Sequence, residues 1–427
     1  MPAEQTLAQA IPDESAYARP LRIALLGYRS APHTGGQGVY LRQLSRALVA
    51  AGHEVTVISG PPYPHLDDGV QLVKLPSLDL YAAGLGAVGL GQLCADRLAR
   101  TEWLSKLTGG FAEPWTFAER ARDYLLPRLH EFDVIHDNQT LADGVLDLQR
   151  AGANLVTTIH HPITRDRRHA IEQAANWRQR LLVRRWYRFV HMQARVAQQL
   201  NRVVTVSGPS YRDICTDFGV DSRRMSIVPP GVDLTVFRPR PEVIREPLRL
   251  ITTASADAPL KGLDILLKAL ARLRTTVGDV RLTLIGRPKA DGVTQRLITD
   301  LNLQDAIECY SALSDEDMVH CYAQASVAVV PSRYEGFGLP AIEAMACGVP
   351  LVSSAGGALP EVVQDAALLF QVGDDEALAR QVALLLGAEN LRADYSERGL
   401  KRVASEYSWA SCADRLVALY RAGLSSC

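Results

Sequence analysis

The segment 327–354 constrains the fold of this chain more than any other. A short apolar strand, 327–330, is followed by a loop broken by glycines, 335–338. A helix is then expected from Pro340 to Cys347, because proline suits a first helical turn, where its missing N–H would have no partner. A second apolar strand, 351–354, follows at once. Since the free N–H groups at a helix start attract anions, this strand–loop–helix–strand unit predicts a phosphate site.

Two carboxylates mark this unit. Glu335 lies in the loop, and Glu343 falls early in the helix. Two acids beside a phosphate would repel it unless each carboxylate has a neutral hydroxyl or a transient cation as its partner. A sugar nucleotide offers both: ribose hydroxyls for one acid and a transferring sugar for the other. The residue types alone equally allow Glu343 to complement the helix dipole and Glu335 to cap the loop.

Length and composition indicate an ordinary globular protein of two domains. The 427 residues exceed one usual core, and 47% hydrophobic with 22% charged residues is average for a folded chain. A formal net charge of -1 gives no general case for nucleic-acid binding. The seven cysteines are scattered, with no metal-ligand spacing and no disulfide framework, which is typical of a cytoplasmic protein. Residues 1–20 read as a flexible tail without a signal-peptide pattern.

Residues 21–232 predict an N-terminal Rossmann-like domain. An apolar strand, 21–27, precedes a glycine loop, a helix at 39–51 and a strand at 54–59. This βαβ unit lacks the G-x-G-x-x-G spacing of dinucleotide binders, which disfavours a dehydrogenase. The further strands expected in the domain, each with polar residues at its carboxyl end, are 133–137, 155–160 and 202–207, and a long helical stretch separates the last two.

A proline-dense linker around 229–241 separates a second Rossmann-like domain, 245–407. There a strand at 248–254, a helix at 262–274 and a strand at 281–286 repeat the same alternation. The fold class predicted is α/β, with two doubly wound parallel-sheet domains and ligand loops facing an interdomain cleft.

The motif EGFGLPAIEAMACGVPLV at 335–352, with Gly356-Gly357 and Pro360-Glu361-Val362 after it, resembles the signature of the retaining glycosyltransferases of family 4. The resemblance extends over nearly the whole chain. It implies the GT-B architecture and a last helix, 408–427, that crosses back to the first domain. It also implies transfer of a sugar from a UDP- or GDP-sugar donor to the hydroxyl of a glycan or lipid-linked acceptor, without a metal or other cofactor.

The resemblance assigns roles to residues of the second domain. Glu343 is expected to bind the ribose hydroxyls, and Glu335 to lie near the transferring sugar. Lys261, at a strand-to-helix loop, would neutralise the pyrophosphate together with backbone N–H groups of the loop, namely Gly336, Phe337, Gly338 and Leu339. Without the resemblance, Lys261 reads equally as a solvated lysine.

This chain departs from the family pattern at one place. An arginine usually stands five or six residues before the lysine as a second phosphate clamp, but Ser255 and Ala256 occupy those positions. Arg287, after the next strand, is the substitute that the sequence offers.

In the first domain, the resemblance places a histidine near the sugar, and we assign it to His160. His161 is the rival for this role, and a strand-end histidine bonded to the backbone is the alternative without function. Gly36 would let the backbone approach the donor, whereas Gly35 and Asp137 are expected on the acceptor side. The two glycines also suit a plain tight turn.

The stretch 161–202 carries ten arginines against Asp166 and Glu172, with four aromatic residues among them. Such a basic helical stretch predicts contact with an anionic membrane surface, which would place the protein at the inner face of the membrane. A solvated basic face whose aromatic side chains pack inward is the alternative, and nucleic acid is disfavoured because no known binding motif accompanies the charge.

Other functions remain open on the sequence. A sugar-nucleotide epimerase or a phosphorylase could use the same architecture, and the missing arginine also allows a catalytically silent sugar-nucleotide or glycan-binding protein. Slow release of free nucleotide from a donor would indicate a transferase, and no release would indicate the silent protein.

Overall fold

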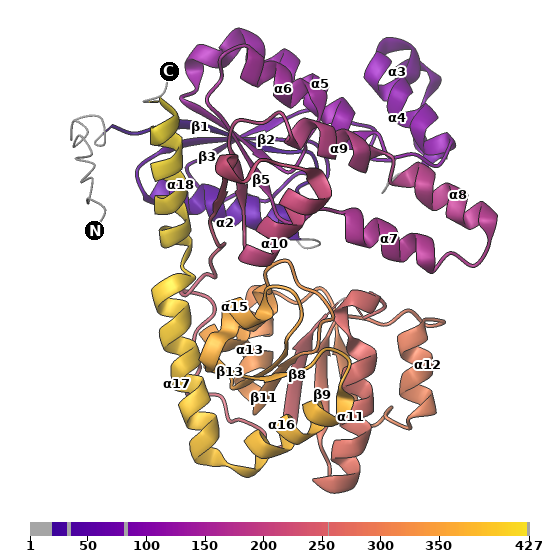
Figure 1. Ribbon diagram of the computed structural model, residues 1–427, viewed down its shortest axis with the longest axis vertical. Helices are drawn as coiled ribbons and strands as arrows, with labels where there is room; N and C mark the ends of the chain where they lie inside the picture. The colour runs from indigo at the N-terminus through magenta and orange to yellow at the C-terminus, as the bar shows by residue number, and fades with distance from the viewer. Residues whose placement is uncertain (1–18, 32–35, 81–83, 255, 425–427) are drawn as a thin grey trace, which may run out of the picture.

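The computed structural model describes residues 19–31, 36–80, 84–254 and 256–424. It contains two parallel sheets, of seven and six strands, each with helices on both faces (Figure 1). The predicted α/β fold with two Rossmann-like halves is therefore confirmed. Of the predicted N-terminal tail, residues 1–18 lie outside the described residues, and Arg19 forms an ion pair of 3.1 Å with Asp133.

The first sheet has the order β3-β2-β1-β4-β5-β6-β7. Its central strands are buried, as expected for a parallel sheet covered on both faces. The order of strand addition reverses between β1 and β4, so the loops after these two strands diverge and leave a crevice. The strands are β1 (Arg22–Gly27), β2 (Glu54–Ser59), β3 (Val70–Lys74), β4 (Val134–Asn138), β5 (Leu155–Ile159), β6 (Val203–Thr205) and β7 (Met225–Ile227).

Two sets of helices cover the first sheet. Helix α2 (Gly36–Ala50) shares one hydrophobic cluster with α18 (Trp409–Leu424), while α5, α6 and α9 pack on the other face. The remaining helices of this half form its connections. Besides α2, the helices are α3 (Leu90–Ala95), α4 (Arg97–Leu107), α5 (Glu113–Leu125), α6 (Asp143–Arg150), α7 (Thr164–Glu172), α8 (Trp177–Trp186), α9 (Phe189–Ala197) and α10 (Gly208–Asp213).

The second sheet has the order β10-β9-β8-β11-β12-β13, with its reversal between β8 and β11. Its strands are β8 (Arg249–Thr253), β9 (Arg281–Ile285), β10 (Ile307–Tyr310), β11 (Val327–Val330), β12 (Leu351–Ser354) and β13 (Ala367–Phe370). Its helices are α11 (Leu263–Thr276), α12 (Val293–Asp300), α13 (Asp315–Gln324), α14 (Leu339–Ala346), α15 (Leu359–Val363), α16 (Asp375–Gly387) and α17 (Glu389–Glu406).

The chain passes between the two sheets twice, first from β7 to β8 and then from α17 to α18, and these two connecting segments contact each other. After α17, the chain passes back so that α18 lies along the first sheet (Figure 1). The backbone of Val232 donates a hydrogen bond of 2.8 Å to the carbonyl of Tyr407. A side chain at Gly231 would meet the backbone nitrogen of Trp409 at 2.2 Å, so only glycine permits this approach. The hydroxyl of Tyr420 then bonds to Nδ1 of His136 in β4 at 2.5 Å.

The structure differs from the sequence expectations in places. The helical stretch expected between β5 and β6 is three helices, α7, α8 and α9, with breaks between them. The strands β3, β7, β10 and β13 were not predicted. Of these, β3 and β10 are partly exposed and mix polar with apolar residues, so neither produces the apolar run that marks a buried strand. Within the described ranges, no helix combines the length and the apolar composition needed to cross a membrane.

Candidate active site

The reversal point of the second sheet brings two loops together. One follows β8 and ends at Lys261, and the other follows β11 and contains Glu335. Gly262, at φ +64°, packs so tightly that a Cβ would lie 2.1 Å from the carbonyl oxygen of Pro331. The backbone N–H of Arg333 also donates to the carbonyl of Leu260 at 2.7 Å. The loops are thus joined at the edge where ligands of such sheets bind.

Lys261 and Glu335 form an ion pair at this junction. The distance from Lys261 Nζ to Glu335 Oε1 is 2.8 Å, and the hydroxyl of Ser332 donates to the same carboxylate oxygen at 2.7 Å. Glu335 is buried, with 8% of its surface exposed, whereas about a third of the Lys261 side chain faces solvent. Glu335 is therefore held in a fixed orientation with its charge balanced.

Helix α14 begins beside this pair. Gly338, at φ +111°, is its N-cap, a backbone conformation that favours glycine. Phe337 is 7% exposed, and its ring packs edge-on against Tyr407 at 5.5 Å between centroids. Gly336, Phe337 and Leu339 can therefore offer backbone groups to a ligand, while the ring of Phe337 belongs to the core.

Glu343 lies one turn into α14. Its Oε2 accepts a hydrogen bond of 3.4 Å from the hydroxyl of Tyr322, which also bonds to Thr253 at the end of β8 at 3.0 Å. Burial raises the pKa of Glu343 to about 7, with the Tyr322 bond acting in the opposite direction. A half-buried carboxylate with one weak partner retains acceptor capacity for hydroxyl groups.

Of the two positions where the family arginine usually stands, the structure describes only Ala256, which is not cationic. Ala256 is buried in the hydrophobic cluster under α11, and Ser255 lies outside the described residues. Arg287 follows β9 and is exposed, and the part of the chain that the structure describes shows no ion pair for it. Arg287 therefore lies at the correct sheet edge, with its charge available.

The first domain presents His160 at the end of β5. Its Nε2 bonds to Oδ1 of Asn138 at 2.7 Å, its backbone N–H donates to Gln139 Oε1 at 2.8 Å, and Tyr40 packs edge-on against its ring. Burial lowers the pKa of His160 to about 3, and the neighbouring His161 acts in the same direction. His160 is thus a neutral, oriented imidazole. His161 is more exposed, and its Nε2 lies 3.4 Å from Asp166.

Asp137 does not face the cleft, contrary to its expected acceptor-side place. It is fully buried, and its carboxylate accepts the backbone N–H groups of Thr140 and Leu141 at 3.2 Å each. Burial raises its pKa to about 6. Asp137 therefore shapes the loop after β4, which carries Gln139 at φ +58° and so positions His160.

The glycine loop after β1 is described only in part. Gly35 lies outside the described residues, and Gly36 is the first residue of α2, exposed, with open space where a side chain would stand. The close approach in this region occurs at Gly38 instead, where a Cβ would lie 2.1 Å from the carbonyl oxygen of Ala31. The spacing of these glycines does not by itself show which of them packs closely.

Direct hydrogen bonds join the two halves of the site. The hydroxyls of Ser207 and Ser210 donate to the carbonyl of Gly336 at 2.6 and 3.1 Å. Tyr334 donates to Asp213 at 2.5 Å. A Cβ on Gly336 would lie 3.5 Å from the carbonyl of His160, so the expected sugar-side residues of both domains meet. These hydroxyl groups could not be identified from the sequence, because the partner of each lies in the other domain.

Comparison with known proteins identifies the family of this chain. A model of the glycosyl transferases group 1 matches residues 238–402, and a model of glycosyltransferase family 4 matches residues 34–236. The chain belongs to the family 4 glycosyltransferases.

Relatives of this glycosyltransferase agree in length. The MMP alpha-(1->4)-mannosyltransferase of Mycolicibacterium hassiacum is 45% identical over 95% of this chain and 99% of its own. A sucrose-phosphate synthase from Thermosynechococcus elongatus has the same fold, with a TM-score of 0.71 at 24% identity, covering 95% of this chain and 100% of the other. The Anabaena HepE complex with UDP-glucose follows with a TM-score of 0.68 at 17% identity, over 95% and 100% of the two chains.

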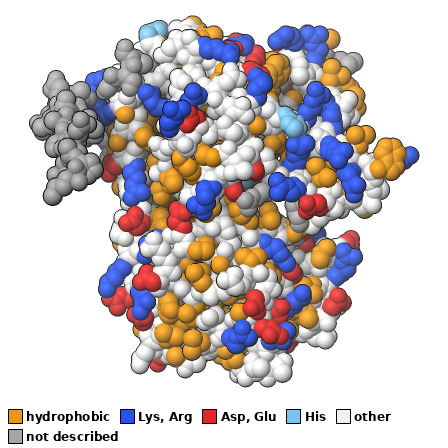
Figure 2. Space-filling model, in the orientation of Figure 1, with side chains coloured by type: hydrophobic (Ala, Val, Ile, Leu, Met, Phe, Trp, Pro, Cys, Tyr) orange, Lys and Arg blue, Asp and Glu red, His pale blue; other side chains and the backbone are white. Residues whose placement is uncertain are grey.

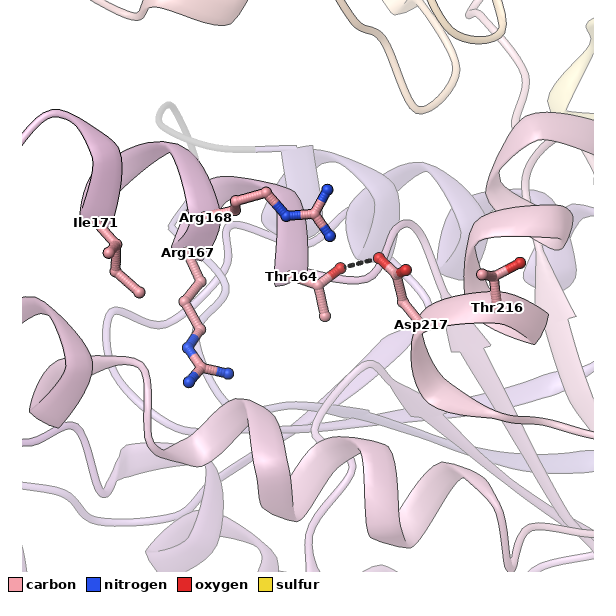
Figure 3. Close-up of a pocket in the computed structure, with 6 residues that line it drawn as sticks. All are labelled: Thr164, Arg167, Arg168, Ile171, Thr216 and Asp217. Atoms are coloured by element: carbon pink, nitrogen blue, oxygen red, sulfur yellow. Dashed lines mark hydrogen bonds between the residues drawn. The ribbon is translucent and has the colours of Figure 1, made fainter.

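Two cavities of this glycosyltransferase differ in their relation to the site. One of about 350 Å³ lies between the domains and is lined by Lys261 and Glu335 on one side and by His161 on the other. The other, of about 460 Å³, lies in the first domain between α7 and the segment 214–218 and contains no expected site residue. There Thr164 donates to Asp217, Arg168 extends toward both, and Arg167 points the other way (Figure 3). Of these two cavities, the interdomain cavity is therefore the one that expected site residues line.

Proposed function

We propose that this glycosyltransferase transfers a mannosyl residue from a nucleotide-activated mannose to a hydroxyl of a glycan acceptor, forming an α-(1→4) bond with retention. The observation that carries the donor side is the Lys261–Glu335 pair at the reversal point of the second sheet, with Glu343 one helix turn away. The sugar and the linkage are those in the name of the relative at 45% identity.

The donor's pyrophosphate would occupy the junction of the two loops. Lys261 would balance the charge that grows on the leaving phosphate, and the first backbone N–H groups of α14 would donate to its oxygens. Glu343 would accept hydrogen bonds from the ribose hydroxyls. Because these groups supply the positive field, we propose that no metal is needed; activity that survives EDTA would support this, and loss restored by a divalent cation would contradict it.

The sugar transfer itself would take place on one face of the donor. The bond from C1 of the sugar to the phosphate oxygen breaks, the acceptor oxygen bonds to C1 on the same face, and the acceptor proton passes to the departing phosphate. Glu335 is committed to Lys261 and Ser332, which disfavours a covalent glycosyl–Glu335 intermediate. Neutral His160, with Nε2 bonded to Asn138, would contribute its other ring nitrogen to a sugar hydroxyl.

The test uses the purified full chain with GDP-mannose, UDP-glucose, GDP-glucose and UDP-N-acetylglucosamine. We expect GDP-mannose, the mannosyl donor of this panel, to raise the melting temperature most, since a ligand stabilises the state that binds it. That donor and a methyl α-mannoside acceptor should yield a disaccharide whose anomeric configuration and linkage are read by NMR. A β-linked product would overturn retention, and a preference for another sugar would overturn the mannosyl assignment.

The same assay separates the other functions. An epimerase would interconvert donor sugars without an acceptor. A phosphorylase would require inorganic phosphate or a sugar phosphate. A silent binding protein would be stabilised by the donor yet release no nucleotide, either alone or with acceptor.

A further inference from the structure

Helix α8 is unusual because no residue in it is buried. A surface helix of a globular protein normally buries an apolar stripe. Residues 177–188 contain five arginines and no carboxylate. The protrusion formed by α7 and α8 stands out from the first domain in Figure 1, and Figure 2 shows Lys and Arg side chains gathered there around hydrophobic ones.

One face of α8 is anchored to the protein. Arg185 donates to the hydroxyl of Thr108 at 3.0 Å, and a Cβ at Gly109 would lie 3.1 Å from Leu182. The ring of Trp186 stacks on Phe111 with 4.9 Å between centroids. These contacts fix the orientation of α8 against the segment that follows α4.

The opposite face of α8 is exposed and both apolar and basic. Trp177 and Leu181 are 69% and 60% exposed. At 3.6 residues per turn they share about a third of the helix circumference with Arg180 and Arg184. No carboxylate of the described residues pairs with either of these exposed arginines. Leu104 and Leu107 of the neighbouring α4 are each 55% exposed as well. We call this face, defined by Trp177, Arg180, Leu181 and Arg184, the α8 face.

We propose that the α8 face attaches the protein reversibly to an anionic lipid bilayer. Arginines meet anionic headgroups, while Trp and Leu side chains enter the boundary between headgroups and acyl chains. A second copy of the chain fits less well. A two-fold contact would place the basic face of one copy against the same face of the other, where like charges repel.

The position of α8 relates attachment to the interdomain cavity. Asp166 and Ala170 of α7 line that cavity, as does Tyr187 directly after α8. The attached face and the cavity thus lie on one protruding unit, so the bilayer would lie close to the cavity entrance. This inference stands apart from the proposed sugar transfer, because attachment is measured without donor or acceptor.

The test is co-sedimentation of the full chain with vesicles of phosphatidylcholine alone or with about 30% phosphatidylglycerol, at low and high salt. We expect binding to the anionic vesicles only, because each basic residue near such a surface strengthens partitioning about fivefold. High salt should abolish binding, since at about 0.5 M the screening length falls to roughly 4 Å. At low salt, R180Q/R184Q should weaken partitioning about 25-fold, and W177S should weaken it as well.

The matched control is R296Q/R380Q, which removes two exposed arginines of the second domain and the same charge. It should partition within about twofold of the unchanged protein, because these side chains lie away from α8. Equal loss in both double variants would overturn the proposal, as would equal binding to neutral and anionic vesicles or binding to neither. The protein could instead form a dimer in sedimentation velocity, bind no vesicles, and become monomeric in the W177S variant. That result would assign the α8 face to contact with a second copy. Circular dichroism checks that every variant is folded.

Discussion

Lys261 Nζ lies 2.8 Å from Glu335 Oε1, and this pair joins the two loops at the reversal point of the second sheet. The proposed site thus holds a cation and a carboxylate together before a donor enters. A bound pyrophosphate would give Lys261 a second anionic partner, while Glu335, still held by Lys261 and Ser332, would act on the sugar through its charge. The two residues should therefore respond differently to mutation.

Replacing Lys261 by alanine should lower kcat/KM by about 30- to 1,000-fold. Removal of one positioned charge at a developing anion costs roughly 2–4 kcal/mol in the transition state. Steady-state kinetics with the preferred donor provides the measurement. Lys268→Ala, at an exposed position of α11, is the control and should leave kcat/KM unchanged. Near-normal activity of the Lys261 variant would indicate that Arg287, rather than Lys261, neutralises the pyrophosphate.

Glu335→Gln should reduce kcat far more than it changes the donor Kd. The amide keeps the shape but loses the negative charge, which is needed only while positive charge develops on the sugar. Calorimetry gives the Kd and initial rates give kcat. A matched weakening of both would show that Glu335 acts in ground-state donor binding, contrary to the proposal. Glu316→Gln, whose side chain is 83% exposed, controls for a general charge effect.

Donor binding should release protons near neutral pH, because burial raises the pKa of Glu343 to about 7 and ribose hydroxyls would stabilise its ionised form. Donor affinity should accordingly rise with pH through about 7 and then level off. Calorimetry in buffers of different ionisation enthalpy counts the protons. Glu343→Gln should weaken donor binding and remove the proton release; persistence of the release would exclude Glu343 as its source.

The same carboxyl should affect stability in the absence of donor. Its pKa in the folded protein is raised above the ordinary value of 4.5, so the folded state holds more protons between about pH 4.5 and 7, and stability falls as pH rises through this window. Glu343→Gln should therefore melt at a higher temperature than the unchanged protein at about pH 8. The difference should disappear below about pH 4.5. A constant difference across that range would contradict the shift.

The acid side of the pH–rate profile should lack an inflection from His160, whose pKa burial lowers to about 3. Asn138→Asp would place a carboxylate at the atom that now lies 2.7 Å from His160 Nε2 and should raise that pKa. The variant should then show a new inflection in kcat/KM, matched by the titration of His160 in NMR spectra. An unchanged titration would disprove the assigned contact.

The sequence predicted the second domain well where local patterns carried the information. The strands 327–330 and 351–354 occur at the predicted residues. Glycine and proline mark the start of α14 because backbone geometry leaves few alternatives. Glu335 and Lys261, 74 residues apart, meet because both follow neighbouring parallel strands.

The burial of individual side chains and the contacts between the domains could not be predicted, because they depend on residues that lie far apart in the sequence. Asp137 follows an apolar run like any strand-end acid, and only the loop folded over it makes it buried. The bond from Gly208 N–H to Glu361, 153 residues later, requires both domains to be placed. The basic stretch 161–202 could be identified by composition, yet which face of α8 is exposed became clear only from its contacts with Thr108 and Phe111.

The return of α18 to the first sheet means that one face of this sheet is covered by a segment that is synthesised after the second sheet. Tyr420 is fully buried there, against His136. During translation, the sheet is finished long before α18 leaves the ribosome, an interval of roughly 10–40 s at 5–20 residues per second. Over that time the face built from β1, β4 and β5 has no cover from Trp409, Leu416 or Tyr420. The N-terminal half of the chain is thus expected to need protection by a chaperone until α18 has been made.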